Sequence, residues 1–376
     1  MEIKRTVQAQ IESWLFKQKV IIILGARQVG KTTLSRQLLK KYGSEEDYFN
    51  CDLLSVRRTF ENNEAKELKR IIGKSKFIVI DEAQRVKDIG ITLKIIHDTY
   101  PDIQIIATGS SSFDLASKTN EPLTGRSIEF QLFPFSIGEL SQIYKKYEFA
   151  SAIQQFLRFG TYPEIVGKSE KDSILLLEQL TSNYLFKDIL EFEQIKKPDL
   201  IVKLLQLLAL QIGSEVSRHE LATALGVNRN TIDRYIDMLE KSFVIFRLKP
   251  LSRNLRKEIT KKDKIYFYDL GIRNALISRF NNLEVRDDIG GIWENLCIVE
   301  RMKYLSNNMI FHNKWFWRTH DQKEVDYIEE YNGKFEGYEF KWLTKKVVFP
   351  KDFLEAYPNS TISLVNLENC LEFFGE

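Results

Sequence analysis

The decisive stretch of this sequence is Val20-Ile21-Ile22-Ile23-Leu24-Gly25-Ala26-Arg27-Gln28-Val29-Gly30-Lys31-Thr32-Thr33. Five apolar residues run into a loop that is bracketed by glycines and ends in lysine and threonine. This spacing fits a P-loop, and a helical pattern follows it. Glycines let the backbone turn tightly and point N–H groups at phosphate oxygens, while the start of a helix adds its positive dipole end. The stretch therefore predicts a nucleotide-phosphate site.

The polar residues of this loop have separate expected roles. All of residues 25–33 are candidates for contact with ATP. Lys31 would reach the β- and γ-phosphates, and the Thr32 hydroxyl would ligate Mg²⁺. The alternative is a glycine loop that only connects a strand to a helix.

A second apolar run, residues 77–80, ends in the adjacent carboxylates Asp81 and Glu82. A buried parallel strand delivers its C-terminal residues to the site. We expect Asp81 to hold the Mg²⁺ shell and Glu82 to act as general base on the attacking water. The alternative is a strand end that happens to be acidic. The interval from Lys31 to Asp81 also suggests an extra strand between the two motif strands. This order resembles the AAA-like branch of P-loop ATPases.

Other polar residues could approach the γ-phosphate. Residues 103–110 form an expected strand that ends near Thr108 and Ser110, and either hydroxyl could sense the γ-phosphate. Arg126 precedes an expected fifth strand and could supply positive charge, from its own chain or from a neighbouring subunit. A strand-end hydroxyl without function and a surface arginine are the alternatives.

The middle of the chain is expected to be helical, over residues 151–160, 172–195 and 200–212. Two further short helices follow. The first begins in a capping box at Ser217 and ends at Gly226, and the second is capped by Asn228, which together describe a helix-turn-helix. Residues 243–248 would start a wing.

A basic stretch follows this motif, with seven basic residues against two acidic ones between Lys249 and Lys264. Such a stripe predicts contact with the phosphates of duplex DNA. On the second helix, Arg229, Asn230 and Arg234 could face the DNA. The acidic residues of that helix weaken this case, and the alternative is a winged helix used for packing.

The last part of the chain holds four polar residues that could converge. Glu294 lies on an expected helix, and Asp326 lies on an expected strand. Strand periodicity places Glu339 and Lys341 on one face of the next strand. Carboxylates at this spacing could hold Mg²⁺, and the lysine could stabilise a pentavalent phosphate. The alternative is an amphipathic strand with a charged solvent face.

Length and composition set outer limits. The 376 residues suggest two or three domains, and 43% hydrophobic and 28% charged residues exclude a disordered or fibrous class. The net charge of +3 implies no partner by itself. Three widely spaced cysteines indicate reduced thiols, and no apolar run approaches the ~18 residues of a membrane span. We expect a cytoplasmic protein without a membrane partner.

Motifs along residues 15–345 resemble one family, the prokaryotic AAA-type P-loop ATPases whose uncharacterised C-terminal module joins a winged helix to a restriction-endonuclease-like fold. The carriers are the segments 25–32, 80–84, 108–110, 123–126, 160–164, 293–295, 324–326 and 339–341. The resemblance implies an α/β fold with a parallel-sheet ATPase domain (1–145), a helical connector with a winged helix-turn-helix (146–270) and a restriction-endonuclease-like α/β domain (271–376).

The implied function is ATP binding and hydrolysis, with Mg²⁺, that controls a C-terminal DNA-binding module. An ATP-regulated, Mg²⁺-dependent nuclease and a nucleotide-gated protein-interaction switch are the alternatives. Assembly into a homo-oligomer is left open, because nothing in the sequence decides it.

Overall fold

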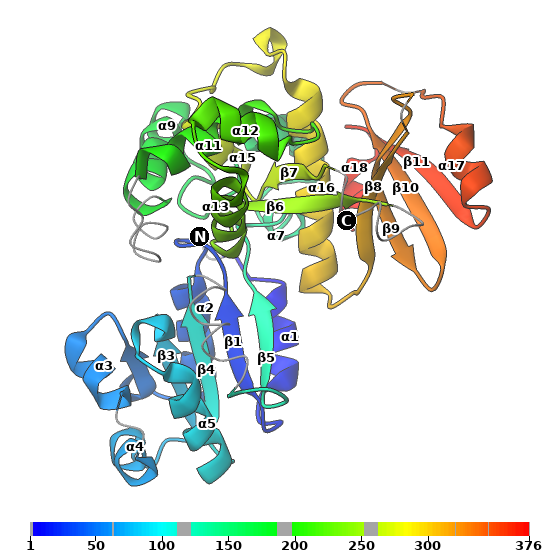
Figure 1. Cartoon of the computed structure of the whole chain (residues 1–376). Helices are drawn as coiled ribbons and strands as arrows, with labels where there is room; N and C mark the ends of the chain where they lie inside the picture. Colours follow the sequence, from blue (N-terminus) through cyan, green and yellow to red (C-terminus); the bar gives the residue numbers. More distant parts are fainter. Residues whose placement is uncertain are drawn as a thin grey trace. The chain divides into compact units, whose positions relative to one another are not determined.

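The computed structural model describes residues 3–61, 64–110, 122–185, 198–251, 262–319, 321–344 and 346–375. The chain divides into two compact units (Figure 1). The first consists of Glu2–Pro134 with Lys241–Phe243, and the second contains Phe135–Glu240 and Val244–Glu376. The expected domain limits near residues 145 and 270 stay a prediction.

The first unit is built on a five-stranded sheet in which all neighbouring strands are parallel. Its order is β2-β3-β4-β1-β5. The strands are β1 (Val20–Leu24), β2 (Tyr48–Asn50), β3 (Phe77–Asp81), β4 (Gln104–Gly109) and β5 (Ser127–Gln131). The expected α/β fold with a parallel sheet is confirmed here. Because parallel strands end at the same edge, the residues after β1, β3 and β4 are brought together.

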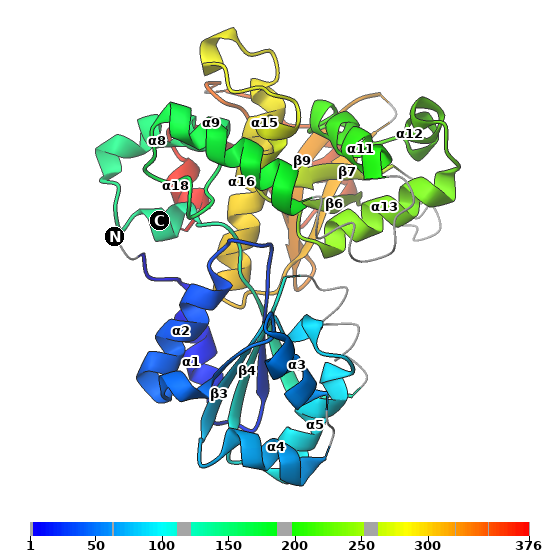
Figure 2. The same ribbon diagram turned by 90° about the vertical axis from the view of Figure 1, so that its left-hand side faces the viewer.

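Helices cover both faces of this sheet. On one face lie α1 (Val7–Trp14) and α2 (Lys31–Tyr42), and on the other lie α3 (Leu54–Phe60), α4 (Ala65–Ile72) and α5 (Ile89–Thr99) (Figure 2). Strands β1 and β3 are buried at every position. Burial on both faces explains why these strands read as uninterrupted apolar runs in the sequence.

Two details of the first unit differ from the sequence expectation. The strand between the P-loop strand and the Asp81 strand is β4, which follows β3 in the chain, whereas β2 pairs outside β3. The length of the interval after Lys31 indicates that an additional strand exists. It does not predict the place of that strand in the sheet, which depends on strand pairing. The second difference concerns residues 56–73, whose polar sequence predicts a single helix, whereas the structure forms two helices there, α3 and α4.

The second unit begins with helices and continues with a mixed sheet. Gly226, with a φ of 64°, ends the first helix of the helix-turn-helix in the left-handed conformation that glycine adopts readily. Of the helix expected over residues 172–195, residues 186–195 lie outside the described residues. The helices are α7 (Ile137–Leu140), α8 (Phe149–Phe159), α9 (Glu170–Gln179), α11 (Pro198–Leu210), α12 (Arg218–Leu225), α13 (Arg229–Lys241), α15 (Leu270–Leu276), α16 (Ile289–Asn307), α17 (Lys351–Ala356) and α18 (Cys370–Phe373).

The sheet of the second unit has the order β11-β10-β9-β8-β6-β7. Its strands are β6 (Ile245–Pro250), β7 (Lys264–Phe267), β8 (Asn313–Arg318), β9 (Glu324–Tyr331), β10 (Lys334–Phe340) and β11 (Ser360–Val365). Strand β6, expected to start a wing, pairs with β7 and also in parallel with β8. It therefore belongs to the larger sheet. The winged-helix and restriction-endonuclease-like types stay predictions.

A buried polar network ties the start of the second unit to α16. The Lys303 ammonium donates to the Phe135 carbonyl at 2.9 Å, to Glu300 at 2.6 Å and to the Thr161 hydroxyl at 3.2 Å. The other oxygen of Glu300 accepts from the backbone N–H of Ile137 at 2.7 Å. The chain that leaves the first unit at Pro134 is therefore anchored at once by hydrogen bonds inside the second.

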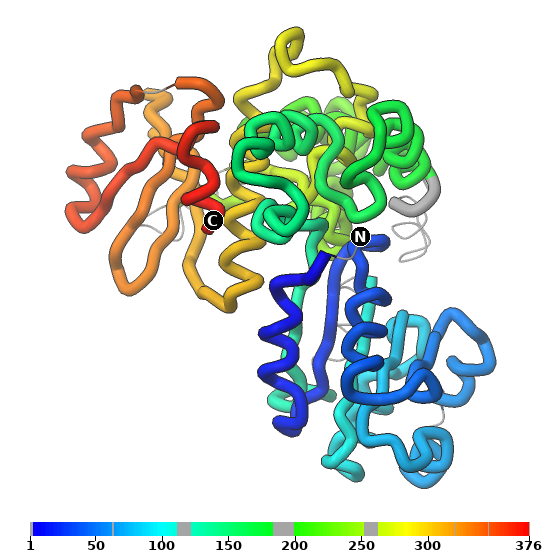
Figure 3. The backbone as a smooth tube through the Cα atoms, turned by 180° about the vertical axis from the view of Figure 1, so that it is seen from behind, coloured from blue at the N-terminus to red at the C-terminus, as the bar shows by residue number. Residues whose placement is uncertain are grey.

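The end of the chain returns to α16, as the red end of the tube shows (Figure 3). The Arg301 guanidinium lies 5.0 Å from the centre of the Phe373 ring and donates to the Phe373 carbonyl at 3.0 Å. None of the helices in the described part of the chain combines the length and apolarity needed to cross a bilayer. The cytoplasmic location stays a prediction.

Candidate functional site

The loop after β1 has the backbone of a phosphate cradle. A Cβ atom on Gly25 would lie 2.2 Å from the Leu132 carbonyl oxygen, so only glycine fits this close approach. Gln28 and Gly30 have φ values of 60° and 101°, and Gly30 directly precedes α2. The loop thus turns sharply into the N-terminus of a twelve-residue helix, where free N–H groups and the helix dipole favour an anion.

Lys31 is folded onto this loop. Its side chain is buried, and its ammonium donates to the carbonyl oxygens of Gly25 at 2.9 Å and Ala26 at 2.8 Å. Both of these acceptors are neutral. Phosphate oxygens entering the loop would replace them with stronger, charge-assisted hydrogen bonds.

Asp81 is held at the end of β3 by three hydroxyl groups. Its Oδ2 atom accepts from the Thr32 hydroxyl at 2.9 Å and from the Tyr48 hydroxyl, while Oδ1 accepts from the Thr108 hydroxyl. Asp81 is only 3% exposed. Burial and the neighbouring Asp81 raise the pKa of Tyr48 above its ordinary value.

Glu82 adopts a left-handed conformation, with a φ of 53° and a ψ of 42°. Non-glycine residues rarely adopt it, and it costs on the order of 1 kcal/mol. Two contacts stabilise it. The backbone N–H of Glu82 donates to the Thr108 hydroxyl at 3.1 Å, and the Glu82 carboxylate accepts from the Gln84 amide at 2.6 Å. The same amide donates to Ser110 at 3.1 Å, so the expected base and one expected sensor share Gln84.

Arg5 also supports the loop. Its guanidinium is buried and donates to the carbonyl oxygen of Val29 at 2.9 Å and to that of Phe133. The sequence analysis missed Arg5, Tyr48 and Gln84. Gln84 lies within the segment that carried the family resemblance, but a lone arginine near the N-terminus and a strand tyrosine carry no spacing signal.

Arg126 lies away from this site. It precedes β5, and its carbonyl accepts from the N–H of Val20, the first residue of β1, so it sits at the sheet edge opposite the P-loop. Its guanidinium pairs with Asp98 at 2.7 Å. The hydrogen bond from Arg126 and, to a smaller extent, the one from His97 lower the pKa of Asp98 to about 2. The expectation that Arg126 supplies positive charge to the γ-phosphate of its own subunit is therefore wrong, because strand β1 lies between Arg126 and the loop. A role at a neighbouring subunit stays a prediction.

The candidate DNA-contact residues lie on the outer side of α13. Arg229, Asn230 and Arg234 are all exposed, whereas the apolar residues of the helix are buried. The acidic residues that weakened the DNA interpretation are paired within the unit. Asp233 contacts Arg218 at 2.7 Å, and Arg247 contacts Asp237 at 2.9 Å.

Much of the basic stretch lies outside the described residues, which omit 252–261. Lys264, at its end, is 1% exposed and cannot reach a phosphate backbone. Its ammonium lies 2.8 Å from Glu294 and also contacts Glu324. The interpretation of Lys264 as part of a DNA-facing stripe was therefore wrong, since its charge is used inside the unit.

The four candidate nuclease residues lie in one polar cluster of the second unit. Lys341 contacts Glu339 at 3.2 Å and Asp326 at 3.5 Å, and Asp326 accepts from the N–H of Phe340 at 2.8 Å. Glu294 lies close enough to interact electrostatically with Asp326 and Lys341, and it pairs with Lys264 and accepts from the Tyr266 hydroxyl.

Charge repulsion and burial act on this cluster. Burial raises the pKa of Glu294 to about 7 against the attraction of Lys264, and burial together with Asp326 raises the pKa of Glu339 to about 7. Across the described ranges, however, no three histidine, cysteine or carboxylate side chains are arranged to hold a metal ion. The metal-binding role of this cluster stays a prediction.

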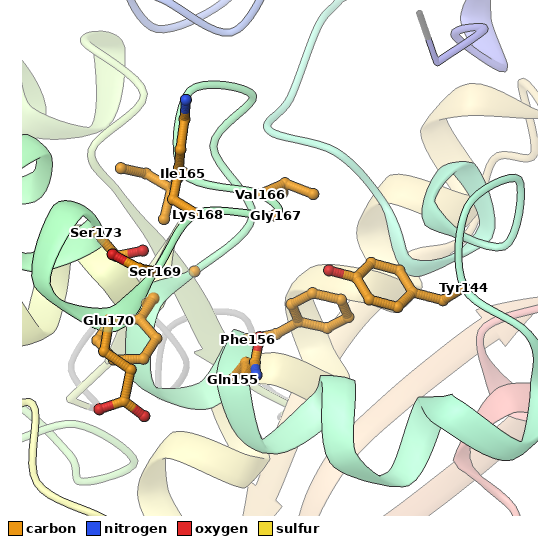
Figure 4. Close-up of a pocket in the computed structure, with 12 residues that line it drawn as sticks. Tyr144, Gln155, Phe156, Ile165, Val166, Gly167, Lys168, Ser169, Glu170 and Ser173 are labelled. Carbon is orange, nitrogen blue, oxygen red and sulfur yellow. The ribbon is translucent and has the colours of Figure 1, made fainter. Parts of the chain in front are cut away.

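The second unit also contains a cavity of about 240 Å³ (Figure 4). Tyr144 and Phe156 lie at one end, and Lys168 and Ser169 belong to a loop on the other side. The cavity is smaller than the ~300 Å³ at which small-molecule pockets usually begin. None of the residues predicted to be functional lines it, so it adds nothing to the candidate site.

Three segments of the chain match known protein families. Residues 17–141 match the family described as "AAA domain". Residues 150–283 and 289–371 match a "Domain of unknown function (DUF8612)" and a "Domain of unknown function (DUF4143)". The first match spans the parallel sheet and supports the ATPase part of the expected resemblance. The other two descriptions assign no activity.

Similar proteins occur in bacteria and archaea. The chain is 27% identical to the uncharacterized protein Rv2008c of Mycobacterium tuberculosis over 341 residues, which cover 90% of this chain and 74% of that protein. It is 26% identical to the uncharacterized protein MJ1637 of Methanocaldococcus jannaschii over 314 residues, covering 73% and 65%. A solved DNA polymerase III gamma subunit-related protein of Thermotoga maritima superposes with a TM-score of 0.27 at 11% identity, over 62% of this chain and 99% of that one. A score this low carries no argument.

Proposed function

We propose that this protein binds ATP with Mg²⁺ and hydrolyses it at the loop after β1. The observation that carries the proposal is the convergence of Lys31, Thr32, Asp81 and Glu82 at one edge of the parallel sheet, where Thr32 and Asp81 are hydrogen-bonded at 2.9 Å. The match of residues 17–141 to the AAA domain supports the same conclusion.

The donor atoms fit magnesium. Mg²⁺ prefers hard oxygen ligands, and it is commonly bound through one or two protein oxygens together with phosphates. The Thr32 hydroxyl and the Asp81 carboxylate supply such oxygens. When bound, the ion would neutralise charge on the phosphates. Lys31 would exchange its two carbonyl partners for phosphate oxygens. Glu82, steadied by Gln84, would accept the proton of the attacking water.

Two substitutions test these roles. Lys31→Ala is expected to abolish nucleotide binding or hydrolysis, and Glu82→Gln is expected to retain ATP while hydrolysis falls by at least 100-fold. Lys41→Ala is a matched control, because Lys41 lies on the same helix but pairs with Glu12 at the surface. Hydrolysis by Glu82→Gln at the wild-type rate would exclude Glu82 as the base.

We further propose that the nucleotide state controls DNA binding by the second unit. The exposed Arg229, Asn230 and Arg234 support this proposal, together with the internal pairing of the acidic residues of α13. The test is ATPase rate and DNA affinity, each measured with duplex and single-stranded DNA and with and without nucleotide. Failure of duplex DNA to bind at low salt, where phosphate contacts are strongest, would favour the protein-interaction switch instead.

The cluster of Asp326, Glu339 and Lys341 favours a second candidate function, Mg²⁺-dependent cleavage of nucleic acid. Asp326→Asn is expected to abolish divalent-dependent cutting of DNA. Asp352→Asn, which breaks an exposed ion pair with Lys323, serves as the control. The assay is repeated in the Lys31→Ala background, so that metal bound at the nucleotide loop does not contribute to the measured cutting. If the wild-type chain cuts none of the nucleic acids tested, the nuclease function is excluded, and the second unit is then a binding module.

A further inference from the structure

Tyr48 reaches the magnesium side of the nucleotide site from the outermost strand of the sheet. In the pairing of β2 with β3, Tyr48 lies opposite Val79, and Asn50 lies opposite Asp81. Tyr48 is therefore a diagonal neighbour of Asp81 on the same face, within reach of a long side chain. Its hydroxyl donates to the same carboxylate oxygen that accepts from Thr32.

A cation holds the ring of Tyr48 in this position. The Arg36 guanidinium lies 4.3 Å from the ring centre. Arg36 belongs to α2, the helix that begins at Lys31 and carries Thr32 in its first turn. The Tyr48 ring is therefore held by α2, the helix that carries the expected magnesium ligand Thr32. The Tyr48 hydroxyl is hydrogen-bonded to Asp81, the other expected ligand.

We propose that Tyr48 is a positioning residue for Mg²⁺ at the nucleotide site, acting through the Asp81 carboxylate. The inference rests on the ATP and Mg²⁺ binding proposed above, and it assigns Tyr48 no contact with the ion.

The physical argument concerns rotation of the carboxylate. Thr108 holds one Asp81 oxygen, and Thr32 and Tyr48 share the other. If Thr32 turns toward a bound ion, Tyr48 is the hydrogen-bond donor that remains on the second oxygen among the residues that the structure describes. Groups that orient a metal ligand in this way typically change metal affinity by about 10- to 100-fold when removed.

The test is Tyr48→Phe in the full chain, which keeps the ring on Arg36 and removes only the hydroxyl. Binding of a fluorescent, non-hydrolysable ATP analogue is titrated at increasing Mg²⁺ and also in EDTA. We expect the Mg²⁺ concentration at half-saturation to rise by about tenfold, while binding in EDTA stays unchanged. Tyr100→Phe is the control, because the Tyr100 hydroxyl donates to the backbone carbonyl of Ala65 in the same unit.

An unchanged Mg²⁺ requirement in Tyr48→Phe would overturn the proposal. Loss of analogue binding in EDTA would do so too, since Tyr48 would then support the loop rather than the metal. A second variant, Arg36→Gln, leaves the hydroxyl but removes the stacked cation, and it should raise the Mg²⁺ requirement in the same direction by a smaller factor. If the wild-type chain binds no analogue at all, the proposed ATP site fails instead, and the two failures are distinct.

Discussion

The amide nitrogen of Gln84 lies 2.6 Å from the Glu82 carboxylate and 3.1 Å from the Ser110 hydroxyl. One side chain thus joins the ends of two neighbouring strands, β3 and β4, beside the proposed general base Glu82. Glu82 is held in an unfavourable left-handed conformation, and Gln84 directs its carboxylate.

Gln84→Ala is therefore expected to slow ATP hydrolysis by about tenfold. A general base typically accelerates a reaction by about 100- to 10,000-fold, and a base that is no longer directed by Gln84 loses a part of that effect. Nucleotide affinity should stay near the wild-type value, because the Gln84 amide donates to Glu82 and Ser110 at the ends of β3 and β4. Steady-state hydrolysis and analogue binding measure the two quantities. Gln8→Ala, which removes a hydrogen bond to Glu12 within α1, is the control. Equal losses in affinity and rate would mean that Gln84 shapes the loop instead.

Arg5→Met is expected to weaken nucleotide binding and to lower the free energy of unfolding of the first unit by about 3 kcal/mol, because two buried carbonyls lose a charged donor. The carbonyl of Val29 belongs to the phosphate loop, so its release makes the loop less ordered. Denaturant unfolding and analogue titration give the two quantities. Arg70→Ala removes an exposed ion pair with Glu67 and should change neither. Wild-type affinity in Arg5→Met would contradict a role in shaping the loop.

Asp288 predicts a pH dependence of stability in the second unit. Burial alone would raise the pKa of Asp288, but hydrogen bonds from Arg286 and Arg273 outweigh it and leave the pKa well below the ordinary 3.8. A lowered folded-state pKa contributes stability above pH ~4 that is lost as the pH falls further. Asp288→Asn should cost about 3 kcal/mol at pH 7, and the difference should shrink toward pH 3. Urea unfolding between pH 3 and 7 measures it, and a pH-independent difference would contradict the prediction.

The two kinds of basic residue in the second unit should behave differently toward DNA. The double substitution Arg229→Ala and Arg234→Ala should reduce the slope of log affinity against log salt by about 2, roughly one per phosphate contact. Lys264→Met should leave that slope unchanged, because Lys264 is buried against Glu294. It should lower the free energy of unfolding by about 3 to 5 kcal/mol. A changed slope in Lys264→Met would show that the cluster opens to DNA.

Local patterns in the sequence were sufficient for part of the site. The P-loop was readable because its glycines and Lys31 are separated by a few residues, and strand β3 was readable because burial on both faces requires an unbroken apolar run. Helix α13 and its turn at Gly226 followed from capping signals. Each of these inferences depends on residues that lie close together in the sequence.

The remaining features depend on contacts between distant residues. Tyr48 and Asp81 are 33 positions apart, and Arg5 and Phe133 are 128 apart. No spacing rule connects such pairs. The same holds for Arg126, whose place at the far edge of the sheet follows from the direction of β5, and for Lys264, whose burial follows from its partner on α16.

The sequence by itself determined that parallel strands deliver a phosphate loop and a pair of carboxylates to one edge of a sheet, since short-range spacing and apolar periodicity encode these features. Only the tertiary structure decided which strand separates the two motifs, which hydroxyls orient Asp81 and which charges are already used inside the protein. Those outcomes depend on strand pairing and side-chain packing, which bring together residues that the chain keeps far apart.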